Sequence, residues 1–250
     1  MSNTPAAVSK LDMLRELGFF PTPDATVLDF GCGSGGVVRD LRSLGYQAYG
    51  CDLEFKNEPG VNTDEMLRNG ILRRIDQAQY LLPFEDNTFQ AVISDQVFEH
   101  VQDYALAVSE IARVLRPGGA SINVFPARYA PIEPHVGVPL ATVVQSRWWL
   151  RFWALLGRRA PDQQSLLASQ VAADNYTYLK NKTNYLPKRA IAREFESHFH
   201  RVRFSERLFL KHSQRGRRMY ALSSAFPFIP WMYSAFRARV VLAAEPVKPS

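Results

Sequence analysis

The chain of 250 residues is poor in cysteine and in long apolar runs. Its two cysteines, Cys32 and Cys51, are interpreted as small buried side chains in a reducing compartment, not as a disulfide or a metal site. No run reaches the roughly 18 apolar residues that predict a membrane-spanning helix. The opening Met-Ser-Asn-Thr-Pro has neither the basic nor the apolar segment of a secretory signal. These absences predict a cytoplasmic protein.

The sequence also lacks histidines, cysteines and acids at metal-ligand spacing, so no metal site is predicted. Positive charge is uneven along the chain. Residues 180–220 carry twelve Lys or Arg against three acids, whereas the whole chain has a net charge of +6. Such a cluster can bind nucleic acid, an anionic membrane surface or a phosphorylated substrate, and a solvated outer face is the simpler interpretation.

What the chain does contain is a glycine-rich turn directly after a short apolar run. Residues 26–30 predict a buried strand, and the glycines within 31–36 predict a tight turn into a helix. Glycine permits positive φ and lets a ligand lie against bare main chain. The turn fits neither the dinucleotide fingerprint nor the phosphate loop, because its glycine spacing is shifted and no Lys-Ser or Lys-Thr follows. Asp29, just before the turn, favours a cationic ligand over a pyrophosphate.

Five segments in order resemble the motifs of class I S-adenosylmethionine-dependent methyltransferases. They are Val-Leu-Asp-Phe-Gly-Cys-Gly-Ser-Gly-Gly at 27–36, Tyr-Gly-Cys-Asp at 49–52, Leu-Pro-Phe at 82–84, Glu-His-Val at 99–101 and Arg-Pro-Gly-Gly at 116–119. The resemblance covers residues 26–126 and implies an enzyme with S-adenosyl-L-methionine as cofactor. It departs from the pattern at Gln90, where the family usually has aspartate.

The resemblance also implies the cofactor contacts. Asp52 ends the second predicted strand, where one carboxylate can accept from two ribose hydroxyls. The family's usual adenine contact falls on Ala78, so Asp76 or Gln79 is the candidate for that role. The full predicted set is Asp29, Gly31, Cys32, Gly33, Asp52, Leu53, Asp76, Gln79, Ser94 and Asp95.

The predicted fold class is α/β, with a Rossmann-like seven-stranded and mostly parallel sheet. One methyltransferase domain spans 1–250, with a core at 20–126 and 187–225, a helical cap insertion at 127–186 and an apolar tail at 226–250. A helix is expected at 6–20, over the cofactor pocket. An antiparallel hairpin is expected to close the sheet at 202–210 and 219–223, and a helix is expected at 231–244.

Methyl transfer from a sulfonium requires a positioned nucleophile and the exclusion of water. A hydroxyl nucleophile also needs a base. His135 and Glu133, held between prolines at the start of the cap, are the predicted base or substrate contact, with Asp95 at the floor of the active site. The Glu-His pair at 99–100 is interpreted as a brace for the pocket.

The sequence thus predicts methylation of a small molecule, at oxygen of a sugar, glycan or other biosynthetic intermediate. A first alternative is a lipid-linked or quinone-like acceptor, reached by peripheral membrane contact through 226–244. A second is a nucleic-acid modifier or binder using 180–220. It is disfavoured because Ser-Asp-Gln-Val stands at 94–97 in place of an Asn/Asp-Pro-Pro-Tyr motif. A cofactor-binding scaffold without catalysis is a third. The oligomeric state is not predicted.

Overall fold

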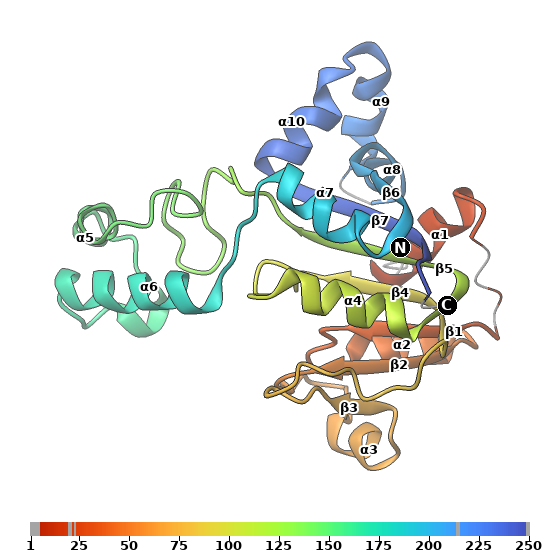
Figure 1. Ribbon diagram of the computed structural model, residues 1–250. Helices are drawn as coiled ribbons and strands as arrows, with labels where there is room; N and C mark the ends of the chain where they lie inside the picture. The colour runs from red at the N-terminus through yellow and green to blue at the C-terminus, as the bar shows by residue number, and fades with distance from the viewer. Residues whose placement is uncertain (1–5, 20–21, 23, 214–215, 249–250) are drawn as a thin grey trace.

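The computed structural model describes residues 6–19, 22, 24–213 and 216–248, and a seven-stranded sheet runs through its centre (Figure 1). Five adjacent strands pair with one another in parallel, and the two strands that come last in the chain are added to the sheet by antiparallel pairing. This is the predicted fold class. In spatial order the strands are β3 (Leu72–Arg74), β2 (Gln47–Asp52), β1 (Thr26–Phe30), β4 (Phe89–Asp95), β5 (Leu115–Pro126), β7 (Ala238–Pro246) and β6 (Phe199–Phe204).

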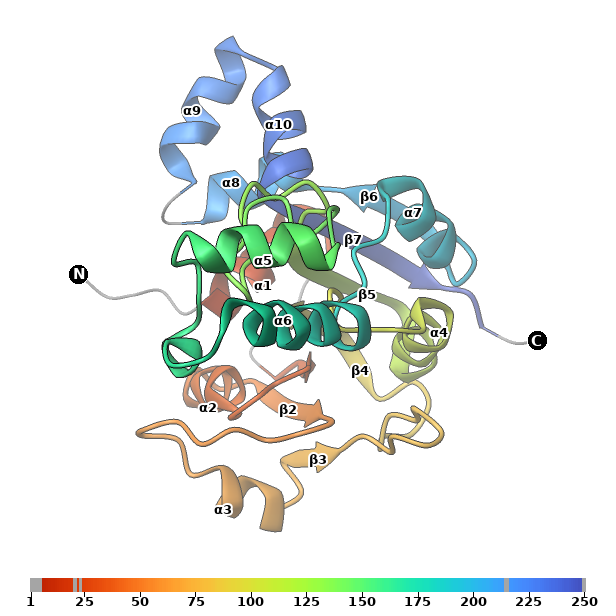
Figure 2. The same cartoon turned by 90° about the vertical axis from the view of Figure 1, so that its left-hand side faces the viewer.

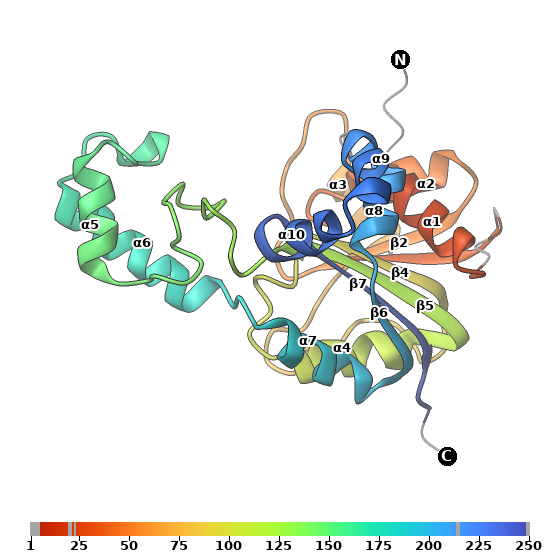
Figure 3. The same ribbon diagram turned by 90° about the horizontal axis from the view of Figure 1, so that it is seen from above.

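Helices cover both faces of the sheet, as the view from above shows (Figure 3). On one face lie α4 (Tyr104–Val114) and α7 (Lys188–Glu196), and on the other lie α1 (Ala6–Glu16), α2 (Gly36–Ser43) and α8 (Glu206–His212). The short helix α3 (Thr63–Arg68) packs beside β3. Strand β1 supplies both cores, because successive side chains of a strand point to opposite faces: Val27 joins one core and Leu28 the other.

Residues 127–187 form the insertion that follows β5. It contains α5 (Arg147–Leu155), a 3-10 turn at Pro161–Gln163 and α6 (Ala168–Lys182). The insertion has a small core of its own, made of Val136, Val138, Ala141, Leu150, Ala172 and Leu179. Figure 2 shows α5 and α6 in front of the sheet, and β5 leads into the insertion at its carboxyl end (Figure 1). The insertion therefore stands at the edge where open α/β sheets bind ligands.

The predicted closing hairpin is wrong in its residues. Strand β6 is confined to Phe199–Phe204, and the chain then forms α8 and α9 (Arg217–Ala225), so 219–223 is helical. Arg215 of the predicted turn lies outside the described residues. The second antiparallel strand is β7, which overlaps the end of the segment predicted as a helix at 231–244. Only the first part of that segment is helical, where it overlaps α10 (Phe228–Phe236).

The error has a physical cause in the position of β7. It lies between β5 and β6, and residues 240–244 are buried on both faces. A strand buried on both faces has a continuous apolar run, without the alternation that separates strand from helix in a sequence.

Among the described residues, no helix combines the length and the apolar character needed to cross a membrane.

Candidate functional site

A cavity of about 340 Å³ opens where β1 and β4 end and α2 begins. Its wall is formed mainly by the glycine-rich turn. Gly33 has a φ of +55°, and a side chain added there would meet no atom within 4 Å, so the main chain is exposed to the cavity. Gly31 has a φ of +77° on the side packed against Val97. The lining residues are Asp29, Gly31, Cys32, Gly33, Ser34, Gly36, Val37, Arg39, Asp40, Glu58 and Asp95.

Two predicted acids, Asp29 and Asp95, line this cavity, and a buried lysine pairs with one of them. Asp29 is 6% exposed, and burial raises its pKa to about 7, with Lys10 opposing the shift and Asp95 adding to it. Lys10 Nζ of α1 donates to Asp95 Oδ2 at 2.7 Å and is itself buried. Sequence reasoning missed Lys10; its one signal was a cation directly beside Leu11, in the apolar stripe of the helix. The helix expected at 6–20 is α1, which ends at Glu16; it reaches the cavity wall through the bond of Lys10 to Asp95.

Asp52 stands at the end of β2, behind the turn. Its Oδ2 accepts from the Gly33 N–H at 2.7 Å, and its Oδ1 accepts from the Glu54 N–H at 3.3 Å. Asp52 and the half-buried Leu53 do not line the cavity. The bond from the Gly33 N–H to Asp52 nevertheless fixes the glycine-rich turn that lines it. Their contact with a ligand stays a prediction.

Three further predicted contacts lie away from the cavity wall. Asp76 accepts from the N–H groups of Ala78 and Gln79 at 2.7 and 3.2 Å, so its carboxylate closes an exposed turn. Ser94 is buried and donates to Asn123 Oδ1 at 2.9 Å. The cavity includes none of Asp76, Gln79 and Ser94, and their proposed roles remain predictions.

The Glu133–His135 pair forms a tightly bonded unit in the cap. Glu133 is fully buried and accepts from the His135 N–H, the Val136 N–H and the Tyr185 hydroxyl at 2.8, 2.7 and 2.7 Å. Its Oε1 also lies 2.7 Å from His135 Nδ1. Tyr185 was missed, because it lies 52 positions along the chain with no motif of its own.

These bonds decide the charges of the pair. Burial alone raises the pKa of Glu133, but the hydrogen bonds from His135, Tyr185 and the main chain outweigh it and hold the pKa below its ordinary value. Burial lowers the pKa of His135, and the hydrogen bond to Glu133 outweighs it, so that the pKa rises. Because Nδ1 is held by a carboxylate, Nε2 is the nitrogen that is left for a ligand.

The Glu99–His100 pair stands beside His135. The imidazole rings of His100 and His135 have centroids 4.7 Å apart, and the Tyr178 ring lies 5.7 Å from that of His135. Glu99 has no exposed surface, and burial raises its pKa to about 7. Neither of its carboxylate oxygens has a hydrogen-bond partner within the part of the chain that the structure describes.

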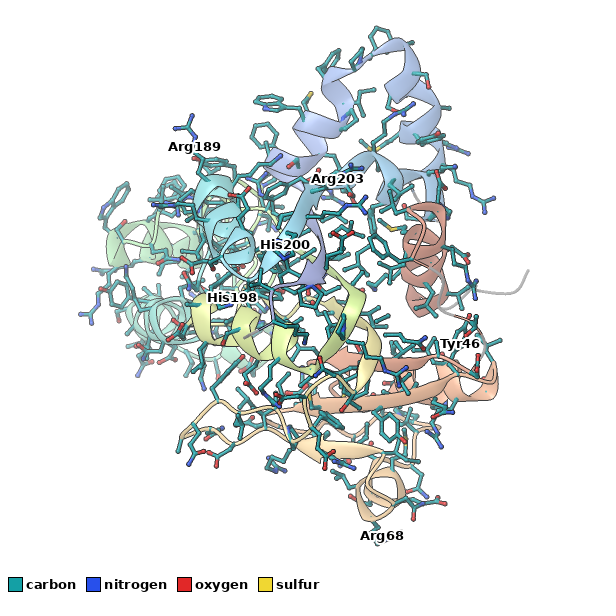
Figure 4. The ribbon with its side chains drawn as sticks, turned by 45° about the vertical axis from the view of Figure 1, so that its right-hand side comes forward. Tyr46, Arg68, Arg189, His198, His200 and Arg203 are labelled. Atoms are coloured by element: carbon teal, nitrogen blue, oxygen red, sulfur yellow. The ribbon has the colours of Figure 1, made fainter. Side chains whose placement is uncertain are left out.

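The basic region stands on the outer surface. Arg189 of α7 and His200 and Arg203 of β6 are exposed on the side of the molecule that Figure 4 brings forward. Of the cavity's lining residues, Arg39 is the only Lys or Arg, and it lies outside this region. The wall of the cavity therefore includes no Lys or Arg of 180–220 among the residues that the structure describes.

Comparison with known proteins agrees with the fold and the turn. A family model described as a methyltransferase domain matches residues 28–122. The chain is 33% identical over 104 residues to sterol 24-C-methyltransferase of Schizosaccharomyces pombe, covering 39% of this chain and 26% of that protein. It is 27% identical over 172 residues to a ubiquinone/menaquinone biosynthesis C-methyltransferase of Brucella abortus, covering 66% of this chain and 58% of that one.

Among solved structures, geranyl diphosphate C-methyltransferase of Streptomyces coelicolor shares the fold. Its TM-score is 0.50 at 20% identity, over 96% of this chain and 74% of that chain. Residues 28–122 thus match a methyltransferase domain, in agreement with the resemblance to the class I S-adenosylmethionine-dependent methyltransferases. The chain spans about a quarter of the sterol enzyme and under two thirds of the quinone enzyme.

Proposed function

We propose that the protein transfers a methyl group from S-adenosylmethionine to a hydroxyl group of a small molecule. The observation that carries the proposal is the cavity between the bare Gly33 main chain and the acids Asp29 and Asp95. The donor carries an ammonium and a sulfonium, and acids in a buried wall attract such cations. The donor supplies an activated methyl group, and the chain supplies position and proton transfer.

Each end of the donor has residues that suit it. Asp29 and Asp95 suit the ammonium, and Lys10 offsets part of their mutual repulsion. Asp52 suits the ribose hydroxyls, because each of its oxygens has lone pairs beyond the one used by the Gly33 or Glu54 N–H. The adenine is then directed toward the segment that follows β3.

The acceptor is proposed to bind between the ends of β4 and β5 and the cap. Asp95 ends β4 on the cavity side, and His135 enters from the segment after β5. Glu133 and Tyr185 hold the imidazole with Nε2 available, so that it can take or orient a hydroxyl proton as the oxygen attacks. A cap over this edge excludes water, which would compete for the methyl group.

A sugar or another polyhydroxylated intermediate remains our first choice of acceptor. The observation in its favour is the polar character of this edge, where Glu99, His100 and His135 lie together. The curated relatives named above are C-methyltransferases, so the identity of the methylated atom is the finer part of the proposal.

Donor binding is tested by titrating the full chain with S-adenosylhomocysteine in a calorimeter. We expect saturable heat, and a loss of affinity of about 10-fold or more in Asp52→Ala, because a charge-assisted hydrogen bond contributes roughly 1.5–3 kcal/mol. Asp64→Ala, which removes an exposed acid on α3, is the matched control and should bind as the wild type does. A wild-type protein that gives neither heat nor a rise in Tm would overturn the proposal.

A lipid-like acceptor is the second candidate, and exposed apolar side chains favour it. Trp231 of α10 is 66% exposed and Trp148 of α5 is 68% exposed. Other large apolar side chains are exposed on or beside the same helices: Phe152, Leu155, Leu156, Phe226, Phe228, Met232 and Phe236. Trp and Phe beside basic residues suit the interfacial layer of a membrane.

Co-sedimentation with anionic liposomes tests this candidate. The double variant Phe228→Ser/Trp231→Ser should remain in the supernatant if α10 contacts the membrane, whereas Leu44→Ser, at an exposed apolar position after α2, should sediment as the wild type does. If the wild type itself stays in the supernatant, the second candidate fails and the first is untouched.

A further inference from the structure

Three side chains from two segments of the chain converge near the donor cavity. Glu99 and His100 follow β4, and His135 belongs to the segment after β5. One ligand atom from each of the three lies within 4.8 Å of the other two, and the imidazole rings face each other edge to face. Sequence spacing could not reveal this group, because 35 positions separate the two histidines.

Both imidazoles are held by the same kind of bond at the same nitrogen. His100 Nδ1 lies 2.7 Å from the carbonyl oxygen of Lys182, and His135 Nδ1 lies 2.7 Å from Glu133 Oε1. A carbonyl only accepts, so His100 Nδ1 must carry the proton, and the carboxylate of Glu133 favours the same tautomer in His135. Each ring thus keeps a lone pair on Nε2. Bonds of this kind orient histidines that bind metals.

The burial of Glu99 is a second observation, separate from the convergence of the three side chains, that points to a ligand. Its side chain has no exposed surface, and both carboxylate oxygens are without a hydrogen-bond partner among the described residues. A buried carboxylate left without a partner is strongly unfavourable, because it has lost its water and gained nothing. A cation bound by Glu99 supplies the missing interaction.

The charges around the group favour a cation there. Asp95 and Glu133 both act on Glu99 as negative charges, and His135 is the positive group acting on it. Lys56 acts on both imidazoles as a positive charge. Within the described residues, no ion pair joins Lys56 to Glu99, so the lysine does not meet the need of the buried carboxylate.

We infer that Glu99, His100 and His135 bind one divalent transition-metal cation that holds the acceptor. Two imidazole nitrogens and one carboxylate oxygen suit Zn²⁺, Mn²⁺ or Fe²⁺, and three protein ligands leave positions open for substrate oxygens. An acceptor with two neighbouring oxygens, such as a vicinal diol, fills two such positions. This inference rests on the proposed function and replaces the direct proton transfer to His135 with transfer assisted by a cation.

The chemical step balances without a further reactant. The cation lowers the pKa of the hydroxyl that it binds, and the hydroxyl proton passes to solvent water. The acceptor oxygen then forms a bond to the methyl carbon while the carbon–sulfur bond breaks and its electron pair stays on sulfur. The products are a methyl ether, S-adenosylhomocysteine and one proton.

The test uses the full chain after dialysis against EDTA and removal of the chelator. Zn²⁺ alone is titrated in a calorimeter, and Co²⁺ alone is followed by its d–d absorption bands, which report imidazole ligands. We expect one site in the wild type. His100→Ala and Glu99→Gln should each weaken it at least 30-fold, and Glu133→Gln by about 10- to 100-fold through the orientation of His135. His200→Ala, at an exposed histidine of β6, should bind as the wild type does (Figure 4).

Folding is checked by Tm for each variant, and His100→Ala keeps the test valid if Glu99→Gln does not fold, since His100 is exposed. Absence of stoichiometric binding of both Zn²⁺ and Co²⁺ in the wild type overturns the inference, as does equal binding in His100→Ala. The outcome is separable from that of the proposed function, because the same EDTA-treated protein is titrated with S-adenosylhomocysteine. Binding of the latter without the metal leaves the proposed function intact.

Discussion

The donor cavity and the cluster of Glu99, His100 and His135 are neighbours at the carboxyl ends of the strands, but their acids have opposite surroundings. In the cavity, Asp95 is paired with the buried Lys10, which also acts on Asp29. In the cluster, both oxygens of Glu99 are without a partner among the described residues. Lys10 therefore neutralises part of the negative charge in the cavity, whereas Glu99 of the cluster needs a cation that the described residues do not supply.

The two regions also differ in how the chain builds them. The cavity wall is mostly the single turn 31–37, and the main chain is exposed to the cavity at Gly33. The cluster uses side chains from two segments, the one after β4 and the one after β5. His100 is bonded to the carbonyl of Lys182, and the Glu133 that holds His135 is bonded to Tyr185. A substitution in the turn therefore alters the whole cavity wall. The side chains of the cluster, in contrast, can be removed one at a time.

The largest expected effect is on the cavity. Gly33→Val should lower the affinity for S-adenosylhomocysteine by more than about 100-fold, since a branched side chain would fill space that the ligand needs in a close-packed wall. Gly45→Val is the matched control, because Gly45 also has a positive φ with no atom near an added side chain. Calorimetry on both variants checks this. Equal losses in the two would show that backbone strain, not occupancy of the cavity, is responsible.

A second change addresses the cluster without touching the cavity. Glu133→Gln keeps the shape of the side chain but removes the charge that orients His135, so turnover should fall by about 10- to 100-fold. Affinity for S-adenosylhomocysteine should stay within about twofold, because Glu133 does not line the cavity. Tyr185→Phe removes one of the bonds to Glu133 and should have a smaller effect. A parallel loss of donor affinity would contradict the separation of the two regions.

A third prediction concerns pH. Burial raises the pKa of Asp29 from 3.8 to about 7, with Lys10 opposing and Asp95 and Asp52 reinforcing the shift. Between these values the folded protein holds a proton that the unfolded chain has released, so stability falls as the pH rises, and above about pH 7 the loss is complete. The Tm of Asp29→Asn minus the Tm of the wild type should therefore be larger at pH 8 than at pH 5. A difference in Tm that does not change with pH would contradict the buried position of Asp29.

The smallest effect is expected at Asp76. Its carboxylate is used by the N–H groups of Ala78 and Gln79 in an exposed turn. Asp76→Ala should thus change the affinity for S-adenosylhomocysteine by less than about threefold, the scale of an exposed substitution. A loss as large as that in Asp52→Ala would show that the turn rearranges to contact the adenine.

The sequence was informative where a feature is local. The turn at 31–36, its position between a strand and a helix, and Asp29 beside it follow from neighbouring residues, and five ordered motifs gave the parallel part of the sheet. The last two strands could not be placed correctly, because β7 is apolar on both faces and its partners β5 and β6 are distant in the chain. Lys10, Tyr185 and the carbonyl of Lys182 reach the site only through tertiary packing, which no spacing records.

The place of β7 has a consequence for the order in which the protein is made. Residues 238–246 lie between β5 and β6, so that until they leave the ribosome both of those strands have an open edge. Open strand edges are templates for pairing with other chains. A nascent chain that still lacks β7 therefore exposes these edges, and the central sheet is completed only when this last strand is added.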